Sequence, residues 1–100
     1  MSSIRRIPEI PFVPTPRTDD AKAAVGFKWA GGTVGTRSKV GGEPTWIQAP
    51  QTPICSCSQP MSFYAELDSI GDSVCLADCG MIYVFVCFDC FETRSLLQSG

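Results

Sequence analysis

The chain of 100 residues contains no histidine. This absence excludes catalytic triads and dyads built on imidazole, metal sites with histidine ligands, and pH switches that depend on histidine. Basic residues are also few, because 8 Lys and Arg stand against 10 Asp and Glu, for a formal net charge of −2. Affinity for nucleic acid comes mainly from clustered Lys and Arg, so this balance argues against nucleic-acid binding. It favours a basic protein as a partner.

Long hydrophobic runs are missing as well. The strongest apolar run, Met81 to Phe88, has the length of a strand and falls short of the ~18–20 residues of a membrane span. Prolines interrupt the N-terminal segment before the apolar run of a secretory signal can develop. We therefore expect a cytoplasmic protein that does not contact a membrane. In that reducing compartment, cysteine pairs are more often metal ligands than disulfides.

The length fits one domain at most. Residues 1–17 are rich in proline, which favours an extended N-terminal arm with little regular structure. The apolar side chains of this arm, Ile7, Ile10 and Phe12 among them, are expected to lie along the domain or along a protein partner. Residues 18–100 are expected to form a single small β domain.

The sequence that follows the arm predicts a mostly β fold. Thr18 can cap one or two helical turns that close at Gly26. Met81 to Phe88 is apolar on both faces and rich in β-branched and aromatic residues, which predicts the central strand of a small antiparallel sheet. Phe27–Ala30 and Thr45–Gln48 are shorter strand candidates between glycine-containing turns.

A second strand is predicted from Met61 to Asp68, where apolar and polar residues alternate. The apolar positions of this segment are expected to face the core. Glu66 and Asp68 share the other face, where a solvated strand surface is a far commoner arrangement than a pair of catalytic carboxylates. Ser69 to Gly80 is expected to be a loop.

Six cysteines are many for a short chain. Cys55 and Cys57 form one closely spaced pair, and Cys87 and Cys90 form another about thirty residues later. Two such pairs outline a zinc-ribbon-like site in which four thiolates close a tetrahedron around a structural Zn²⁺. The alternative interpretation is that these cysteines are ordinary buried thiols.

The two remaining cysteines, Cys75 and Cys79, lie in the predicted loop. We interpret them as buried or half-exposed thiols, which could instead pair with one another or replace a metal ligand. A thioredoxin-like role for Cys87 and Cys90 is disfavoured, because that chemistry needs the C-x-x-C motif at a helix N-terminus and here it follows a strand. A thiol-based redox protein remains one alternative function.

Three segments carry a resemblance to a known family. They are residues 41–48 (GGEPTWIQ), 53–63 (PICSCSQPMSF) and 78–90 (DCGMIYVFVCFDC). In this order they resemble the YwqG-like family of bacterial proteins, over roughly residues 35–99. The resemblance implies that Cys55, Cys57, Cys87 and Cys90 are zinc ligands. The order of motifs is also similar to the programmed cell death protein 2 family, whose members are chaperones for a ribosomal protein.

This sequence departs from the family pattern in its first cysteine pair. The pair is one residue shorter than C-x-x-C, and Ser58 stands where the family has glycine. We therefore expect the backbone amides of this turn to be arranged differently from those of the family.

The sequence favours a binding protein over an enzyme. It has no histidine, and its glycines lack the spacing of phosphate-binding or hydrolase motifs. Exposed aromatic and apolar residues are good interface residues, and the candidates are Ile7, Ile10, Phe12, Trp29 and Tyr64. Trp46 is expected in the core. We predict a non-enzymatic protein that binds one protein partner, most specifically a bacterial immunity protein that neutralises a basic toxin, or alternatively a client-specific chaperone.

Overall fold

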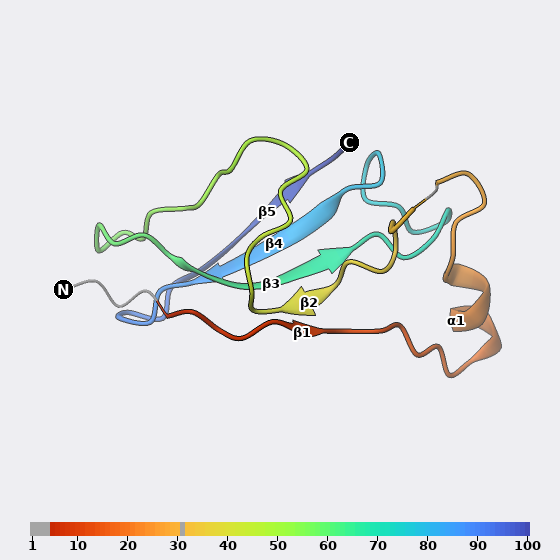
Figure 1. The fold of residues 1–100 in the computed structure, drawn as a ribbon, viewed down its shortest axis with the longest axis horizontal. Coiled ribbons are helices and arrows are strands. Elements are labelled where there is room, and N and C mark those ends of the chain that lie inside the picture. Colours follow the sequence, from red (N-terminus) through yellow and green to blue (C-terminus); the bar gives the residue numbers. More distant parts are fainter. Residues whose placement is uncertain (1–4, 31) are drawn as a thin grey trace.

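The computed structural model describes residues 5–30 and 32–100. In this part of the chain, five strands form one antiparallel sheet in the order of the sequence, and a single short helix lies beside it (Figure 1). The elements are β1 (Ile10–Pro11), α1 (Asp19–Ala24), β2 (Lys39–Val40), β3 (Ser62–Asp68), β4 (Met81–Val86) and β5 (Thr93–Gln98). The predicted mostly β fold is confirmed.

The two long predicted strands are present, but the predicted exposure of Glu66 and Asp68 and the predicted burial of Leu67 are wrong. A β-bulge shifts the register between Phe63 and Ala65, so that one residue of β3 has no partner in β4. Because side chains alternate with a period of two, one extra residue exchanges the faces of all later positions. Glu66 and Asp68 are therefore buried, whereas Leu67 is 48% exposed.

Other differences from the predicted strands have a local explanation. Thr45–Gln48 is a loop, because its backbone N–H groups donate to side chains of the sheet and not to a neighbouring strand. Phe27–Ala30 is also irregular. Conversely, β5 pairs with the whole of β4, although its sequence (TRSLLQ) has little of the alternation that predicts a strand.

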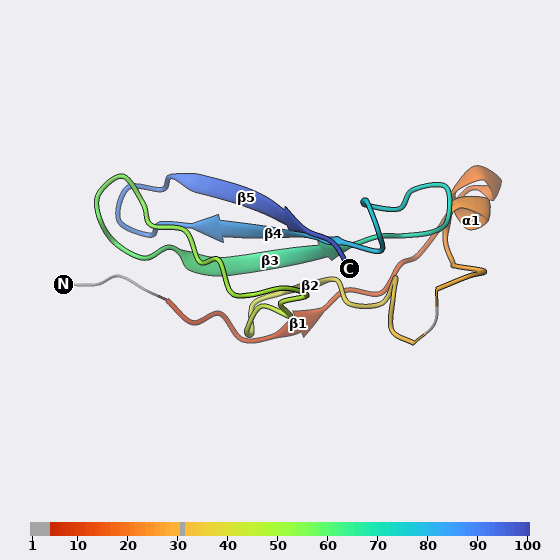
Figure 2. The ribbon, with the colours of Figure 1, turned by 90° about the horizontal axis from the view of Figure 1, so that it is seen from above.

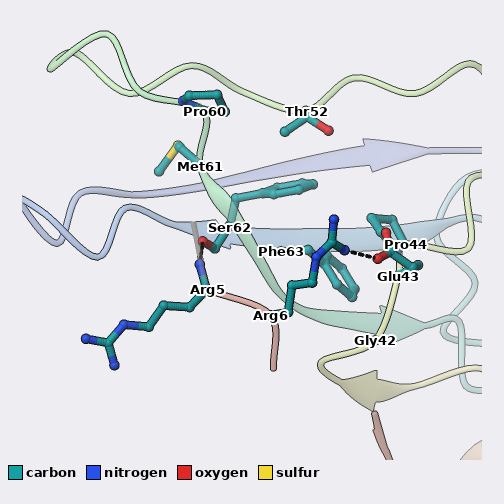
Figure 3. A pocket seen from close by; sticks show the side chains of 11 residues that line it. Arg5, Arg6, Gly42, Glu43, Pro44, Thr52, Pro60, Met61, Ser62 and Phe63 are labelled. Atoms are coloured by element: carbon teal, nitrogen blue, oxygen red, sulfur yellow. Dashed lines mark hydrogen bonds and ion pairs between the residues drawn. The ribbon is translucent and has the colours of Figure 1, made fainter. Parts of the chain in front are cut away.

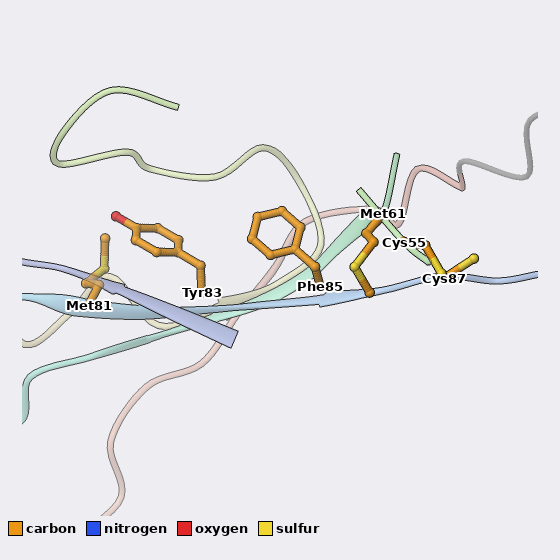
Figure 4. Close-up of a cluster of buried hydrophobic side chains, with 6 residues drawn as sticks. All are labelled: Cys55, Met61, Met81, Tyr83, Phe85 and Cys87. Atoms are coloured by element: carbon orange, nitrogen blue, oxygen red, sulfur yellow. The ribbon is translucent and has the colours of Figure 1, made fainter. Parts of the chain in front are cut away.

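The core lies on one face of the sheet, below the loop that connects β2 to β3. The side chains of Met81, Tyr83 and Phe85 in β4 project to this face, as does that of Cys87 just after the strand (Figure 4). Trp46 covers them from the loop, with its ring 4.8 Å from the ring of Tyr83 and 5.9 Å from that of Phe85. The predicted core position of Trp46 is confirmed.

Buried polar side chains of the sheet fix the covering loop in place. The Tyr83 hydroxyl donates to the Thr45 carbonyl (2.7 Å) and accepts from the Ile47 N–H (3.2 Å). Glu66 accepts from the Thr45 N–H, and Gln98 accepts from the Gln48 N–H, both at 2.8 Å. These bonds give the backbone N–H groups of the loop partners on the sheet and so hold the loop against the core.

The N-terminal arm lies along the edge of the sheet. Its residues Ile10 and Pro11 form β1, which pairs with β2, and its Ile7 carbonyl accepts from the Gly42 N–H (2.7 Å). Closer to the N-terminus, the Arg5 N–H donates to the Ser62 hydroxyl (2.9 Å), and Arg6 forms an exposed ion pair with Glu43 beside a small hollow (Figure 3).

The helix α1 follows the arm at one end of the sheet (Figure 2). Its N-cap is Thr18, whose hydroxyl accepts from the Ala21 N–H at 3.1 Å, as the sequence predicts. This helix has six residues and none of them is buried. Among the described residues, no helix is long and apolar enough to cross a bilayer.

Candidate metal centre

Four cysteines meet at the end of the sheet where β4 finishes. Cys55 and Cys57 lie on the turn that precedes β3, and Cys87 and Cys90 lie on the turn that follows β4. Because β3 and β4 are antiparallel neighbours, the start of one lies beside the end of the other. The four Sγ atoms lie within 4.8 Å of one another. Cys55 and Cys87 are buried, while Cys57 and Cys90 are exposed.

The distances between the sulfur atoms fit a tetrahedral metal site. Cys55 Sγ lies 3.1 Å from Cys90 Sγ, and Cys57 Sγ lies 3.6 Å from Cys87 Sγ. Four sulfurs at a Zn–S bond length of ~2.3 Å would be separated by about 3.8 Å. The contacts are too long for disulfide bonds, whose S–S length is ~2.05 Å. The four side chains can therefore hold one metal ion with all four coordination positions filled by protein.

The second turn directs backbone donors at a sulfur. The N–H groups of Cys90 and Asp89 donate to Cys87 Sγ, and these bonds lower the pKa of that thiol from 9.0 to about 7. Since metals bind the thiolate and not the thiol, this turn prepares Cys87 as a ligand.

The first turn is less favourable to thiolates without a metal. The Cys57 N–H donates to Cys55 Sγ, but the hydrogen bond with the Cys90 thiol and burial outweigh it and raise the pKa of Cys55. Hydrogen bonding with Cys55 likewise raises the pKa of Cys57. Thiols crowded together cannot all ionise unless a cation balances their charge.

Left-handed backbone conformations follow both cysteine pairs. Ser58 has φ 72°, and Phe91 has φ 61°. Glycine adopts such angles without a steric penalty, whereas other residues adopt them at a steric cost. Ser58 therefore keeps the conformation that glycine would adopt at this position. Its N–H donates to the Cys55 carbonyl (2.8 Å), and the Phe91 N–H donates to the Cys87 carbonyl (2.7 Å).

Glu92 connects the two turns, a role that the sequence analysis does not predict. Its Oε1 accepts from the Ser56 hydroxyl at 2.6 Å and lies 3.4 Å from Cys55 Sγ, while its Oε2 accepts from Arg94 at 2.8 Å. The bonds from Ser56, Arg94 and Cys55 lower the pKa of Glu92 to about 2. A carboxylate two residues after a C-x-x-C motif is the only signal in the sequence, and it is a weak one.

The five predicted partner-binding residues lie in different places. Ile10 and Tyr64 are on the face of the sheet that the loop does not cover, where Ile10 pairs across strands with Val40 and Tyr64 lines a shallow depression beside Val84. Phe12 is exposed just after β1, and Ile7 is half-buried at the sheet edge. Trp29 is 89% exposed, in the segment that follows α1.

Comparison with known proteins gives one similar sequence. The chain is 36% identical over 66 residues to "Uncharacterized protein YpfL" of Salmonella typhimurium, a match that covers 63% of this chain and 15% of that protein. The chain thus matches only a small part of a much longer relative. No family model matches the chain, and no solved structure matches it.

Proposed function

We propose that the chain is a zinc-stabilised β module, in which Cys55, Cys57, Cys87 and Cys90 bind one structural Zn²⁺. The observation that carries the proposal is the convergence of four sulfurs within 4.8 Å from two turns that are far apart in the sequence. Tetrahedral all-sulfur sites are typical of zinc and of iron. Zinc fits better with a role in folding, because it has no redox chemistry and needs no open coordination position in a structural site.

Metal analysis of the full chain, purified without added metal, tests this proposal. We expect about one equivalent of zinc per chain. The Cys57→Ser and Cys90→Ser variants should lose the metal, whereas Cys75→Ser and Cys79→Ser, matched substitutions outside the cluster, should keep it. Less than half an equivalent of any metal in a folded wild-type protein would contradict the proposal, and stoichiometric iron would replace zinc as the ion.

We further propose that this module binds a protein partner through the uncovered face of its sheet. Cross-strand neighbours on this face are Leu67, Ile82 and Leu97, and both leucines are 48% exposed. Tyr64 extends the same apolar surface toward the end that carries the cysteines. Solvent-exposed apolar surface on one side of a single-layer sheet is typical of an interaction site.

A pair of surface variants tests this docking face. Leu97→Lys places a charge in the apolar surface, and Trp29→Lys places one on an isolated exposed side chain. We expect one specific protein to co-purify with the wild type and with Trp29→Lys. The Leu97→Lys variant should lose this protein but still bind metal. If Leu97→Lys retains the partner protein and Trp29→Lys loses it, the interface lies in the segment after α1 and not on the uncovered face. Turnover of a small molecule by the purified protein would contradict the non-enzymatic role.

The finer functional predictions remain predictions from sequence. The acidic charge favours a basic partner such as a toxin, which is the role of an immunity protein. The resemblance to the programmed cell death protein 2 family favours a chaperone of one client. A zinc site built from the four cluster thiols needs them reduced, which agrees with the predicted cytoplasmic location.

A further inference from the structure

A second pair of thiols lies in the loop between β3 and β4, at the opposite end of the sheet from the four-cysteine cluster. Cys75 and Cys79 are both half-buried there. The backbone N–H of Cys79 donates to Cys75 Sγ, with an N–S distance of 3.2 Å. Two cysteines separated by three residues would not meet in an extended chain, so the loop conformation itself brings them together.

The conformation of this loop is strongly bent. Ala77 (φ 56°) and Cys79 (φ 53°) both adopt left-handed backbone angles, and the Gly80 N–H donates to the Leu76 carbonyl at 2.8 Å, which closes a five-residue turn. Since non-glycine residues adopt such angles at a cost, the surrounding contacts must hold the turn in this shape.

Hydrogen bonds from Ser69, which directly follows β3, and from Arg37 provide these contacts. The Ser69 hydroxyl donates to the Gly80 carbonyl (2.7 Å) and accepts from the Leu76 N–H (3.0 Å). Arg37 donates to the Cys79 carbonyl at 3.0 Å while it is paired with the buried Asp68. The backbone that follows each of the two thiols is thus anchored to residues of the sheet and its flanks.

The Cys75 thiol also influences the ionisation of Cys79. Burial raises the pKa of the Cys79 thiol, and a hydrogen bond with the Cys75 side chain raises it further. Because the Cys79 N–H already lies 3.2 Å from Cys75 Sγ, the turned backbone brings the two side chains into the neighbourhood that an S–S bond of ~2.05 Å requires. The structure therefore holds the dithiol at a high effective concentration.

We propose that Cys75 and Cys79 form a reversible dithiol–disulfide pair that exchanges with low-molecular-weight disulfides such as oxidised glutathione. The thiolate of one cysteine attacks a sulfur of the small disulfide, which forms a mixed disulfide and releases one small thiolate. The second cysteine then attacks the protein sulfur of the mixed disulfide, forms the Cys75–Cys79 bond and releases the second small thiolate. The two released thiolates take up the two protons that the protein loses, and the protein is oxidised by two electrons.

The experiment uses the full-length, metal-loaded protein, so that the other four cysteines are occupied as ligands. The protein is equilibrated with mixtures of reduced and oxidised glutathione, quenched with an alkylating reagent and analysed by mass spectrometry. We expect a product lighter by two hydrogen atoms, with the new bond mapped to Cys75 and Cys79, and with the metal retained. Returning the sample to reduced glutathione should restore the starting mass.

Single variants supply the matched control. Cys75→Ser and Cys79→Ser each keep one thiol of the pair, so each should stop at a mixed disulfide with one glutathione attached. A trivalent arsenical, which bridges two neighbouring thiols, should bind the reduced wild type and neither variant.

Three results would overturn the proposal. The first is that both thiols remain open to alkylation in oxidised glutathione, and the second is that the wild type stops at the mixed disulfide. The third is that the new bond joins cysteines of the cluster. The first two results concern only Cys75 and Cys79 and would leave the zinc proposal intact, whereas the third would count against both proposals. Absence of metal would not by itself remove the dithiol.

Discussion

The two ends of β4 are held by different chemistry. At the end that follows Val86, four cysteines converge, and thiols with raised pKa values lie beside one whose pKa is lowered. At the end that begins with Met81, Asp68 accepts four hydrogen bonds, two from the Arg37 side chain and two from backbone N–H groups. Under the zinc proposal, the first end takes an ion from solution, whereas the second end supplies both charges of its ion pair from the chain.

This difference has consequences for stability. The buried Asp68–Arg37 pair forms as the chain folds, so its contribution does not depend on any other solute. The four-cysteine end should follow the concentration of free metal, because an ion that binds only the folded state stabilises it by mass action.

Metal removal should have the largest effect. A structural zinc contributes an apparent ~10–16 kcal/mol in small domains, which is comparable to the whole stability of a typical domain. We therefore expect a chelator to abolish the cooperative thermal transition measured by circular dichroism, and added zinc to restore it. The Cys75→Ser/Cys79→Ser double variant should behave like the wild type. An unchanged melting temperature after verified metal loss would show that the cluster is not needed for folding.

Asp68→Asn tests the opposite end of the sheet. The Asp68 side chain is fully buried and the Arg37 side chain is 17% exposed. Removing the negative charge of Asp68 therefore leaves the positive charge of Arg37 largely buried without a counter-charge. Breaking a buried pair in this way costs ~3–5 kcal/mol. Urea denaturation of the metal-loaded protein measures the loss.

The matched control is Glu43→Gln, which breaks an ion pair whose two side chains are both more than three-quarters exposed. Pairs of this kind contribute ~0–1 kcal/mol. Equal losses in the two variants would contradict the importance that we assign to the buried pair.

The pH dependence of thiol reactivity tests the pKa shifts of the cysteines in the cluster. In metal-free protein kept folded by a stabilising osmolyte, the alkylation rate of Cys87 should rise with a midpoint at about pH 7, because the Cys90 and Asp89 N–H groups stabilise its thiolate. A lowered pKa means that the thiolate persists above about pH 7 and is lost as the pH falls through that value.

Cys55 and Cys57, whose pKa values are raised, should react only at higher pH than Cys87. In urea, all three should share the ordinary thiol value of ~8.5. A common midpoint in the folded metal-free protein would show that the turn after β4 loses its amide–sulfur bonds without the metal.

The Ser58→Gly substitution should have the smallest effect on stability, and we expect it to increase the free energy of unfolding. Glycine removes the steric cost of φ 72° at this position, which we expect to stabilise the metal-loaded protein by about 0.5–1 kcal/mol. Ser58→Ala keeps the unfavourable angle and should give no gain. The urea midpoint at constant slope measures both variants, and a less stable Ser58→Gly would show that the serine side chain has a role of its own.

Features that depend only on neighbouring residues can be predicted from the amino-acid sequence. The spacing of Cys87 and Cys90 is enough for a tight turn with two sulfurs and free amides, and the apolar, β-branched run before it is enough for a central strand. Thr18 was also predictable as a helix cap, because its hydroxyl reaches an amide three residues away.

Burial in β3 and the formation of β5 depend instead on contacts between segments that are distant in the sequence. The bulge at Tyr64 places Glu66 and Asp68 inside and Leu67 outside, and no periodicity in the sequence marks an unpaired residue in a strand. The assignment of β5 has the same origin, since its polar residues form a strand through pairing with β4. Burial of Asp68 in turn depends on Arg37, some thirty residues earlier, whose guanidinium offsets the cost of removing a carboxylate from water.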